Sequence, residues 1–147
     1  CLLRPESRGT VSISSKNPLE DPVIDPNYLS NKNDLKTMIE GYKKMMQIMN
    51  TAPLDKFNNV RNPINLKDDK SIESAIRARA DTIYHPVGTC KMGNDEMSVV
   101  DSNLVVRGTK NLRVVDASIM PTLVGGNTNA PTIMIAEKIA DNIKGIS

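Results

Sequence analysis

Residues 111–145, NLRVVDASIMPTLVGGNTNAPTIMIAEKIADNIKG, contain the signals that decide the fold. The apolar run at 112–116 predicts a short strand of the kind that is buried in a sheet. Pro131 predicts the first position of a helix, because proline is tolerated where a backbone N–H is not needed, and Gly145 is expected to end that helix. The stripe that this helix is expected to bury consists of Ile133, Ala136, Ile139, Ala140 and Ile143.

A strand followed by a helix normally lies parallel to another unit of the same kind. Nothing else in these 147 residues predicts such a parallel neighbour. We therefore expect the rest of the sheet to come from sequence outside the chain. The chain is accordingly expected to be a fragment, which begins at Cys1 within an extended segment.

Two more helices are predicted upstream. At residues 34–49 apolar side chains recur at helical spacing, Asn31 or Asn33 can cap the helix, and its four methionines are expected to fill gaps in a core. The second helix is predicted from Ser71, with Ser71 or Asp69 as the cap, to about residue 82.

Strands and a loop complete the predicted elements. Alternating apolar and polar residues favour a strand at 10–14, and a second strand candidate, at 99–106, is interrupted by Asp101, Ser102 and Asn103. Residues 51–69 contain two prolines and no apolar period, which is typical of a loop. Separate helices and strands together predict an α+β fold.

The composition excludes several classes of function. Of the 147 residues, 39% are hydrophobic and 24% charged, with a net charge of +2, as in one soluble globular domain. Charges are interleaved and aromatic residues make up 3%, so we expect no nucleic-acid partner. No apolar run reaches the roughly 18–20 residues that a membrane crossing needs. Cys1 and Cys90 are too few for a disulfide framework and are expected to be reduced.

His85 is the single histidine of the chain and lies in the string YHPVGTCKMG at residues 84–93. A lone histidine is most often structural, and the near-neutral pKa of imidazole alone does not make such a residue catalytic. Pro86, Gly88 and Gly93 predict a rigid, turning segment that presents one side chain from a loop. Neither a catalytic triad nor a metal site is predicted around this histidine.

A second unusual string, GGNTNAPT at residues 125–132, leads directly into the C-terminal helix. Glycines followed by a helix N-terminus leave free amides at the positive end of the helix dipole, which favours an anion. Asn127 or Asn129 could equally be an ordinary helix cap. The residues by themselves leave these two interpretations about even.

Four strings together resemble the C-terminal region of the glucose–methanol–choline (GMC) flavin oxidoreductases. They are residues 4–9, 84–93, 111–121 and 126–134, and they occur in the family's order over nearly the whole chain. The resemblance is strongest to the bacterial choline dehydrogenase and aliphatic alcohol dehydrogenase branch. It implies part of an antiparallel-sheet substrate domain with helices, followed by a β–α unit that completes a FAD-binding domain.

The resemblance also implies a division of the chain. Residues 1–93 would belong to the substrate-binding domain, 94–110 would connect, and 111–147 would return to the FAD-binding domain. The cofactor would be FAD, and the other partner would be the N-terminal FAD-binding half of the same protein. No Gly-x-Gly-x-x-Gly string occurs in these residues, in agreement with that implication.

Site residues follow from the same resemblance. His85 matches the family's catalytic histidine, which accepts the alcohol proton while hydride leaves for the flavin. Asn127 matches the second active-site position, and a carboxamide there can hydrogen-bond the substrate but cannot act as a base. Asp116 and Ala117 match positions beside the ribityl and pyrophosphate part of FAD, and Asn127, Thr128 and Asn129 would bind the flavin edge.

The implied function is oxidation of a primary alcohol to an aldehyde, in the cytoplasm or at the periphery of the inner membrane. Four aromatic residues offer no visible cage for a quaternary ammonium group, which favours an aliphatic alcohol over choline. Choline oxidation is the alternative within the family. A non-catalytic binding module that keeps the fold is the alternative from another class.

Overall fold

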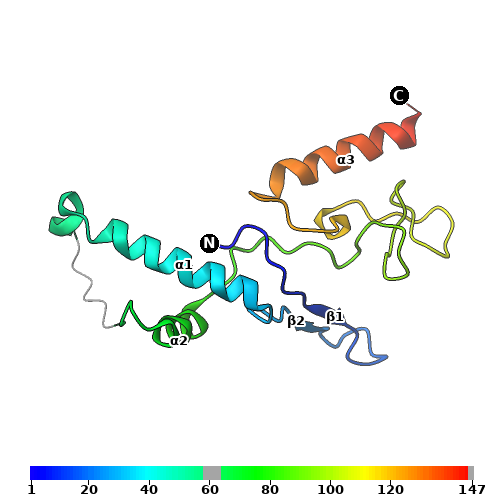
Figure 1. Cartoon of the computed structure of the whole chain (residues 1–147). Helices are drawn as coiled ribbons and strands as arrows, with labels where there is room; N and C mark the ends of the chain where they lie inside the picture. The colour runs from blue at the N-terminus through cyan, green and yellow to red at the C-terminus, as the bar shows by residue number, and fades with distance from the viewer. Residues whose placement is uncertain (58–63, 146–147) are drawn as a thin grey trace. The chain divides into compact units, whose positions relative to one another are not determined.

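The computed structural model describes residues 1–57 and 64–145. The chain divides into two compact units, Cys1–Asp81 and Thr82–Ser147, whose elements are labelled in Figure 1. The described residues contain three α-helices and one two-stranded antiparallel sheet. These elements confirm the α+β fold class. None of the helices described is both long and apolar enough to cross a membrane.

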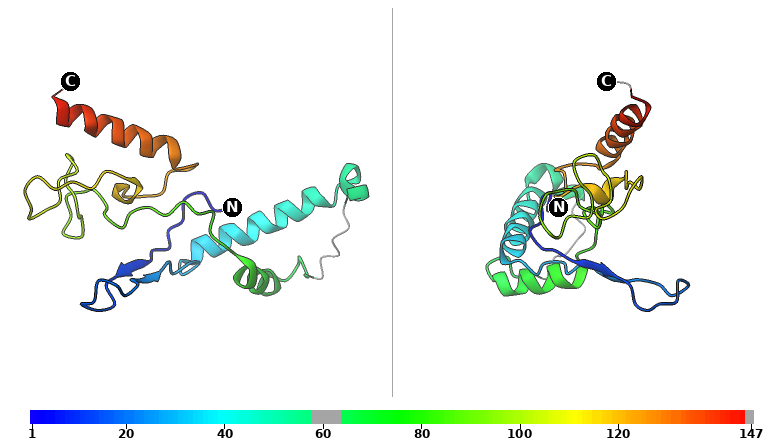
Figure 2. Two further views of the ribbon diagram at one scale, coloured as in Figure 1. Left: turned by 180° about the vertical axis from the view of Figure 1, so that it is seen from behind. Right: turned by 90° about the vertical axis from the view of Figure 1, so that its right-hand side faces the viewer.

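A β-hairpin forms the first regular structure of unit 1. β1 (Thr10–Ser12) pairs antiparallel with β2 (Val23–Asp25), and the ribbon of Figure 2 follows the connection between them. The strand predicted at 10–14 is thus confirmed over three residues, whereas β2 was not predicted. Gly9 allows the two segments to approach, because a Cβ there would lie 2.1 Å from the Asp25 carbonyl oxygen.

Helix α1 (Lys32–Met49) starts at the predicted cap. The Asn31 side chain accepts a hydrogen bond from the Asn33 N–H at 2.8 Å, which satisfies one of the free amides of the first turn. Of the four methionines expected in a core, only Met46 is buried. Met45 is exposed, so the methionine prediction holds for one face only.

Helix α2 (Asp69–Arg79) packs against α1 and buries Ile72 and Ile76. It begins two residues before the predicted start, and its cap is Asp68, whose carboxylate accepts from the Lys70 N–H. The predicted caps were therefore wrong. Asp68 was missed because it stands among polar loop residues that give no apolar period.

The loop predicted at 51–69 is only partly a loop. Residues Ala52–Phe57 form a 3₁₀ helix, η1, directly after α1. Residues 58–63 of the predicted loop lie outside the described residues. A 3₁₀ turn extends a helix end with little sequence signal of its own.

Asp34 fastens the N-terminal segment to the start of α1. Its side chain is 2% exposed and accepts from the Glu6 N–H, the Ser7 N–H and the Ser7 hydroxyl. Burial by itself raises the pKa of this carboxyl. Those hydrogen bonds, with the charge of Arg8, outweigh burial and hold the pKa below its ordinary value of 3.8.

We expect Asp34→Asn to lower the free energy of unfolding by about 2–3 kcal/mol, because two backbone amides lose a charged acceptor. The lowered pKa gives wild-type Asp34 a stabilising contribution that is present above the unfolded pKa and is lost as pH falls through the folded pKa. Denaturant unfolding of the full-length protein between neutral and acid pH measures both effects. Asp141→Asn, at an exposed position of α3, is the control. Equal stability of the two variants would contradict this role.

Unit 2 contains turns joined by isolated bridges in place of the two predicted strands. The bridges join Met92 to Val100, Val100 to Val106 and Val105 to Arg113. Neither the interrupted strand predicted at 99–106 nor the strand predicted at 112–116 is present, so both predictions were wrong. The Asp101 carboxylate accepts from two backbone amides and turns the chain in the middle of the first run. The second run is not buried, since Leu112 is 52% exposed.

A small core holds unit 2 together. Its buried members come from the turns and from the last helix: Val100, Leu104, Ile119 and Ile139. Burial of such aliphatic side chains contributes roughly 1.5–3 kcal/mol each. Met92 and Ile119, from two of the segments that carry candidate site residues, pack in or against this core.

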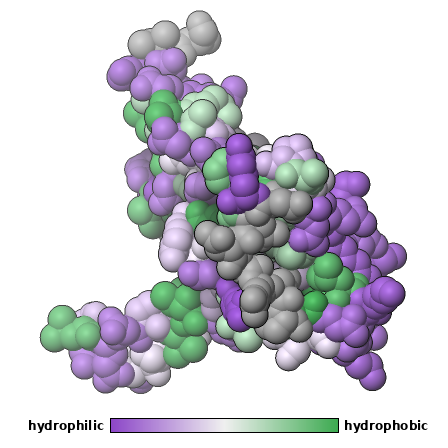
Figure 3. Space-filling model, turned by 90° about the vertical axis from the view of Figure 1, so that its left-hand side faces the viewer, coloured by the Kyte–Doolittle hydropathy of each residue, from purple (hydrophilic) through white to green (hydrophobic). Residues whose placement is uncertain are grey.

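Helix α3 (Asn129–Lys144) ends at Gly145, as predicted, where φ is 71°. Pro131 is its third residue and not its first, because the helix begins at Asn129. Of the predicted buried stripe only Ile139 is buried, while Ile133 and Ile143 are exposed. On the face drawn in Figure 3, hydrophobic residues stand among hydrophilic ones at the surface. The prediction of a buried stripe was wrong because the described residues cover only the part of α3 around Ile139.

Candidate functional site

His85 stands between two residues that restrict the backbone. Tyr84 has a φ of 61°, in the left-handed region, and Pro86 holds the residue before it extended. The imidazole is half-buried, and its Nδ1 is buried with no hydrogen-bond partner among residues 1–57 and 64–145. A buried polar atom without a partner is costly, so this nitrogen points to a group supplied by a ligand or by another part of the protein.

The segment that follows His85 is fixed against the turn at 116–120. The Cys90 N–H donates to the Ser118 carbonyl at 3.0 Å, and the Met92 N–H donates to the Ile119 carbonyl at 2.8 Å. Gly88 adopts a φ of 89°, and a Cβ there would lie 3.3 Å from the Met120 carbonyl oxygen. The structure thus brings two of the predicted site segments together. Cys90 is a half-buried free thiol.

Asp116 caps the short 3₁₀ helix η2 (Ala117–Ile119). Its Oδ1 accepts from both the Ser118 N–H, at 2.8 Å, and the Ser118 hydroxyl. No hydrogen bond to Oδ2 occurs within the described ranges, and the residue is exposed. Ala117, which follows it, is half-buried in the turn. Oδ1 of Asp116 therefore holds the turn, while its Oδ2 could still accept a hydrogen bond from a hydroxyl group.

The string in which an anion site was predicted, residues 125–132, leads into the start of α3. The N-cap is Thr128, without a side-chain cap hydrogen bond, so the alternative in which Asn127 or Asn129 caps the helix was wrong. The first intrahelical bond runs from the Thr132 N–H to the Thr128 carbonyl at 3.0 Å. Pro131 has no N–H, so the amides of residues 128, 129 and 130 are the ones that helix geometry leaves without an intrahelical acceptor.

These residues occupy unit 2, but the structure does not join all of them. Asn127 and Asn129 are exposed and Thr128 is half-buried. Within the part of the chain that the structure describes, no hydrogen bond connects His85 with Asn127. The segment of His85 and the segment of Asn127 are connected indirectly, through the core in which Ile139 of α3 packs with Ile119 of the turn.

A charged loop follows the His85 segment. The Lys91 ammonium lies 2.9 Å from the Asp95 carboxylate, which also accepts from the Ser98 hydroxyl. Hydrogen bonds from Lys91 and Ser98 lower the pKa of Asp95 to about 2. The carboxylate is therefore ionised throughout the neutral range and keeps the loop closed beside Gly93, where a Cβ would lie 2.5 Å from the Ser98 Oγ.

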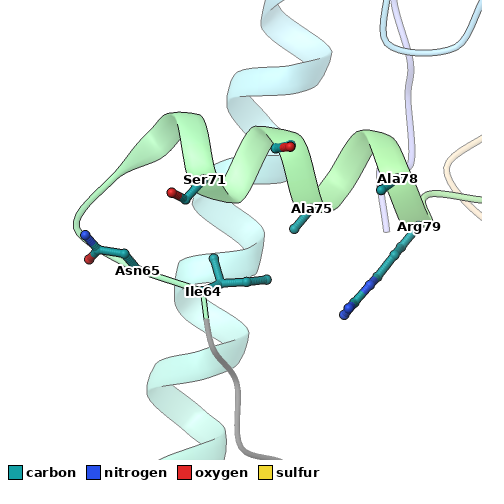
Figure 4. A pocket seen from close by; sticks show the side chains of 7 residues that line it. Ile64, Asn65, Ser71, Ala75, Ala78 and Arg79 are labelled. Carbon is teal, nitrogen blue, oxygen red and sulfur yellow. The ribbon is translucent and has the colours of Figure 1, made fainter.

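A shallow hollow on α2 in unit 1 contains none of the predicted site residues. Small side chains of α2 line it together with Ile64 and Asn65, and the Arg79 guanidinium lies at one end (Figure 4). Among the described residues that line it, Arg79 alone carries a titratable group.

Comparison with known proteins places this geometry in a family. Residues 5–136 match the family model described as GMC oxidoreductase. An alcohol dehydrogenase [acceptor] from Pseudomonas putida is 56% identical over 146 residues, which cover 97% of this chain and 26% of that protein. An oxygen-dependent choline dehydrogenase from Cronobacter sakazakii is 48% identical over 145 residues, with the same two coverages. The chain spans about a quarter of the length of these curated relatives.

Solved structures of flavin-dependent and related oxidases share the fold. A FAD-dependent oxidoreductase from Chaetomium thermophilum superposes with a TM-score of 0.88 at 31% identity, over 97% of this chain and 25% of that one. Pyridoxine 4-oxidase from Mesorbium loti gives a TM-score of 0.83 at 33% identity, over 95% of this chain and 28% of that one.

Proposed function

The chain belongs to the GMC oxidoreductase family, and from that premise we propose that it supplies the proton-accepting wall of a site that oxidises a primary alcohol to an aldehyde. Because the chain spans 26% of its relatives, we propose that it acts as the C-terminal quarter of a longer polypeptide. The remainder would bring the dinucleotide-binding loop. Residues 1–93, 94–110 and 111–147 would be its substrate-domain, connecting and FAD-domain parts.

The observation that carries the proposal is the state of His85. It is the only histidine in the chain, it is half-buried, and its Nδ1 is buried and unpartnered among the residues described. Neutral imidazole donates from one nitrogen and accepts at the other. An acceptor provided to Nδ1 from outside this chain would hold the proton there and leave Nε2 to receive the alcohol proton.

Asn127 would complete the wall without taking part in proton transfer. Its amide N–H can donate to the alcohol oxygen and stabilise negative charge that develops on it. The residue is exposed and is not used as a helix cap, which leaves its side chain available for this contact. His85 would then be the proton acceptor that this chain supplies.

The residues present fit FAD. The chemistry that FAD supplies when bound is acceptance of a hydride from the alcohol carbon. The free amides at the start of α3, near Thr128 and Asn129, would stabilise negative charge on the flavin edge. The free Oδ2 of Asp116, beside Ala117, would accept from a hydroxyl of the cofactor chain.

Choline is the second candidate substrate, because a relative at 48% identity is an oxygen-dependent choline dehydrogenase. A quaternary ammonium group binds best between aromatic faces, and this chain offers few of them. Anaerobic reduction of the full-length flavoprotein by a panel of primary alcohols, with choline included, tests the assignment. Faster reduction by choline than by any alkanol would make choline the first candidate substrate and a primary aliphatic alcohol the second. No reduction by any alcohol would favour a binding module without catalysis.

The isolated 147-residue chain should not hold FAD tightly. It contains no glycine-rich dinucleotide loop, and its contacts would cover one side of the cofactor only. Gel filtration of the purified chain after incubation with FAD measures this, with the full-length protein as the control. A chain that elutes with stoichiometric flavin would contradict the expectation.

A further inference from the structure

We propose that Thr82 and Tyr84 are positioning residues for His85. The Thr82 hydroxyl holds Tyr84 in a left-handed backbone conformation, and this turn aims the imidazole that follows. The inference rests on the proposed function, since it takes His85 as the proton acceptor.

Tyr84 adopts an uncommon backbone conformation. Its φ of 61° lies in a region that side chains other than asparagine and aspartate seldom occupy. Such residues persist only where their surroundings compensate for the strain. Leu104, with a φ of 60°, is buried in the core of unit 2, where packing can hold it. The Tyr84 side chain is 74% exposed, so burial in a core does not hold its conformation.

Thr82 provides a support from the backbone side. The Tyr84 N–H donates to the Thr82 Oγ1 at 3.0 Å, and Thr82 is half-buried. A hydroxyl that accepts from the amide two residues further on stabilises a tight turn. The strained residue is thus held by a hydrogen bond that does not depend on its aromatic ring.

The turn determines where His85 can point. On one side the left-handed Tyr84 sets the direction in which the chain enters, and on the other Pro86 restricts His85 to an extended backbone. The two successive side chains accordingly differ in exposure: the Tyr84 side chain is exposed to solvent, while the Nδ1 of His85 is buried. A base must be held at a fixed place relative to the proton that it removes.

Four variants of the full-length, FAD-loaded protein separate the turn from the side chains. Thr82→Val removes the acceptor but keeps the shape, and Thr82→Ser is its matched control. Tyr84→Val places a β-branched residue at a positive φ, which valine disfavours. Tyr84→Asn places there a residue that adopts a positive φ readily. The measurements are the rate of flavin reduction by 1-butanol, the KM for 1-butanol, the FAD content, and the NMR signal of the His85 ring, assigned by its loss in His85→Ala.

We expect both valine variants to reduce flavin about 10-fold more slowly or worse, because a misplacement of about 1 Å can cost about 10²-fold in rate. KM and FAD content should change little, and the His85 ring signal should shift in these two variants. Thr82→Ser and Tyr84→Asn should remain within about threefold of wild type, as expected where transition-state geometry is kept. If Thr82→Val does not fold, Thr82→Ala removes the same acceptor and is judged in the same way.

Two results would overturn the inference. One is a wild-type rate in the valine variants while His85→Ala is slow, and this result leaves the proposed function intact. The other is a Tyr84→Asn variant as slow as Tyr84→Val, which would assign the effect to the ring. A wild-type rate in His85→Ala contradicts the proposed function itself.

Discussion

Replacement of His85 by alanine should slow reduction of the flavin by alcohol roughly 10²- to 10⁴-fold, the usual contribution of one positioned acid–base group. The chain contains no second histidine that could take over. Asp95, in the charged loop that follows in the sequence, has a pKa of about 2 and is too weak a base at neutral pH to replace imidazole. FAD content should be unchanged, because the contacts proposed for the cofactor lie at the start of α3 and at Asp116.

The measurement is stopped-flow reduction of the full-length holoprotein without oxygen, which isolates the step in which the proton leaves. His85→Gln is the matched variant, since it keeps a hydrogen-bonding side chain of similar reach but cannot accept a proton near neutral pH. Both variants should be slow. A His85→Ala rate within a few-fold of wild type would remove His85 from the mechanism, and a fast His85→Gln would reduce its role to hydrogen bonding.

Local signals were sufficient for one end of α1, one end of α3 and one glycine turn. The cap at Asn31 and the stop at Gly145 depend on the chemistry of one or two residues, so the sequence alone predicts them. The same holds for the turning string after His85, whose glycine at 88 adopts the positive φ that glycine favours.

Pairing between distant segments was not predictable in this way. Residues 112–116 have the composition of a buried strand, yet a strand exists only where a neighbour completes its hydrogen bonds, and here one bridge from Arg113 is all that forms within the described residues. Asp34 was missed as an anchor because its partners Glu6 and Ser7 lie 28 and 27 positions away. No spacing rule connects an acidic residue in a helix with backbone amides that far upstream.

The arrangement of the candidate site depends on contacts of the same long-range kind. The hydrogen bond between Cys90 and Ser118 brings together segments that the sequence could only name separately. The left-handed Tyr84 has no signal in the sequence at all, since aromatic residues favour strands. The candidate residues for chemistry come from the family resemblance, whereas the residues proposed to hold His85 in place come from the backbone geometry.

Asn127→Asp should slow flavin reduction by about 10²–10³, the cost of losing one donor to a developing oxyanion. The carboxylate cannot donate a hydrogen bond, and its charge would repel both the developing alkoxide and the anionic reduced flavin. The midpoint potential of the flavin should fall for the same reason. Asn127→His should be milder, because imidazole retains a donor.

Stability separates this role from a purely structural one. Asn127 is exposed and makes no cap hydrogen bond to α3, and a negative charge ahead of a helix N-terminus is neutral or slightly stabilising. The fold of Asn127→Asp should therefore survive, with unchanged thermal unfolding, while turnover collapses. Asn142→Asp puts the same charge on an exposed position at the other end of α3 and should leave rate and potential unchanged. An Asn127→Asp protein that reduces its flavin at the wild-type rate and potential would show that Asn127 faces neither substrate nor flavin.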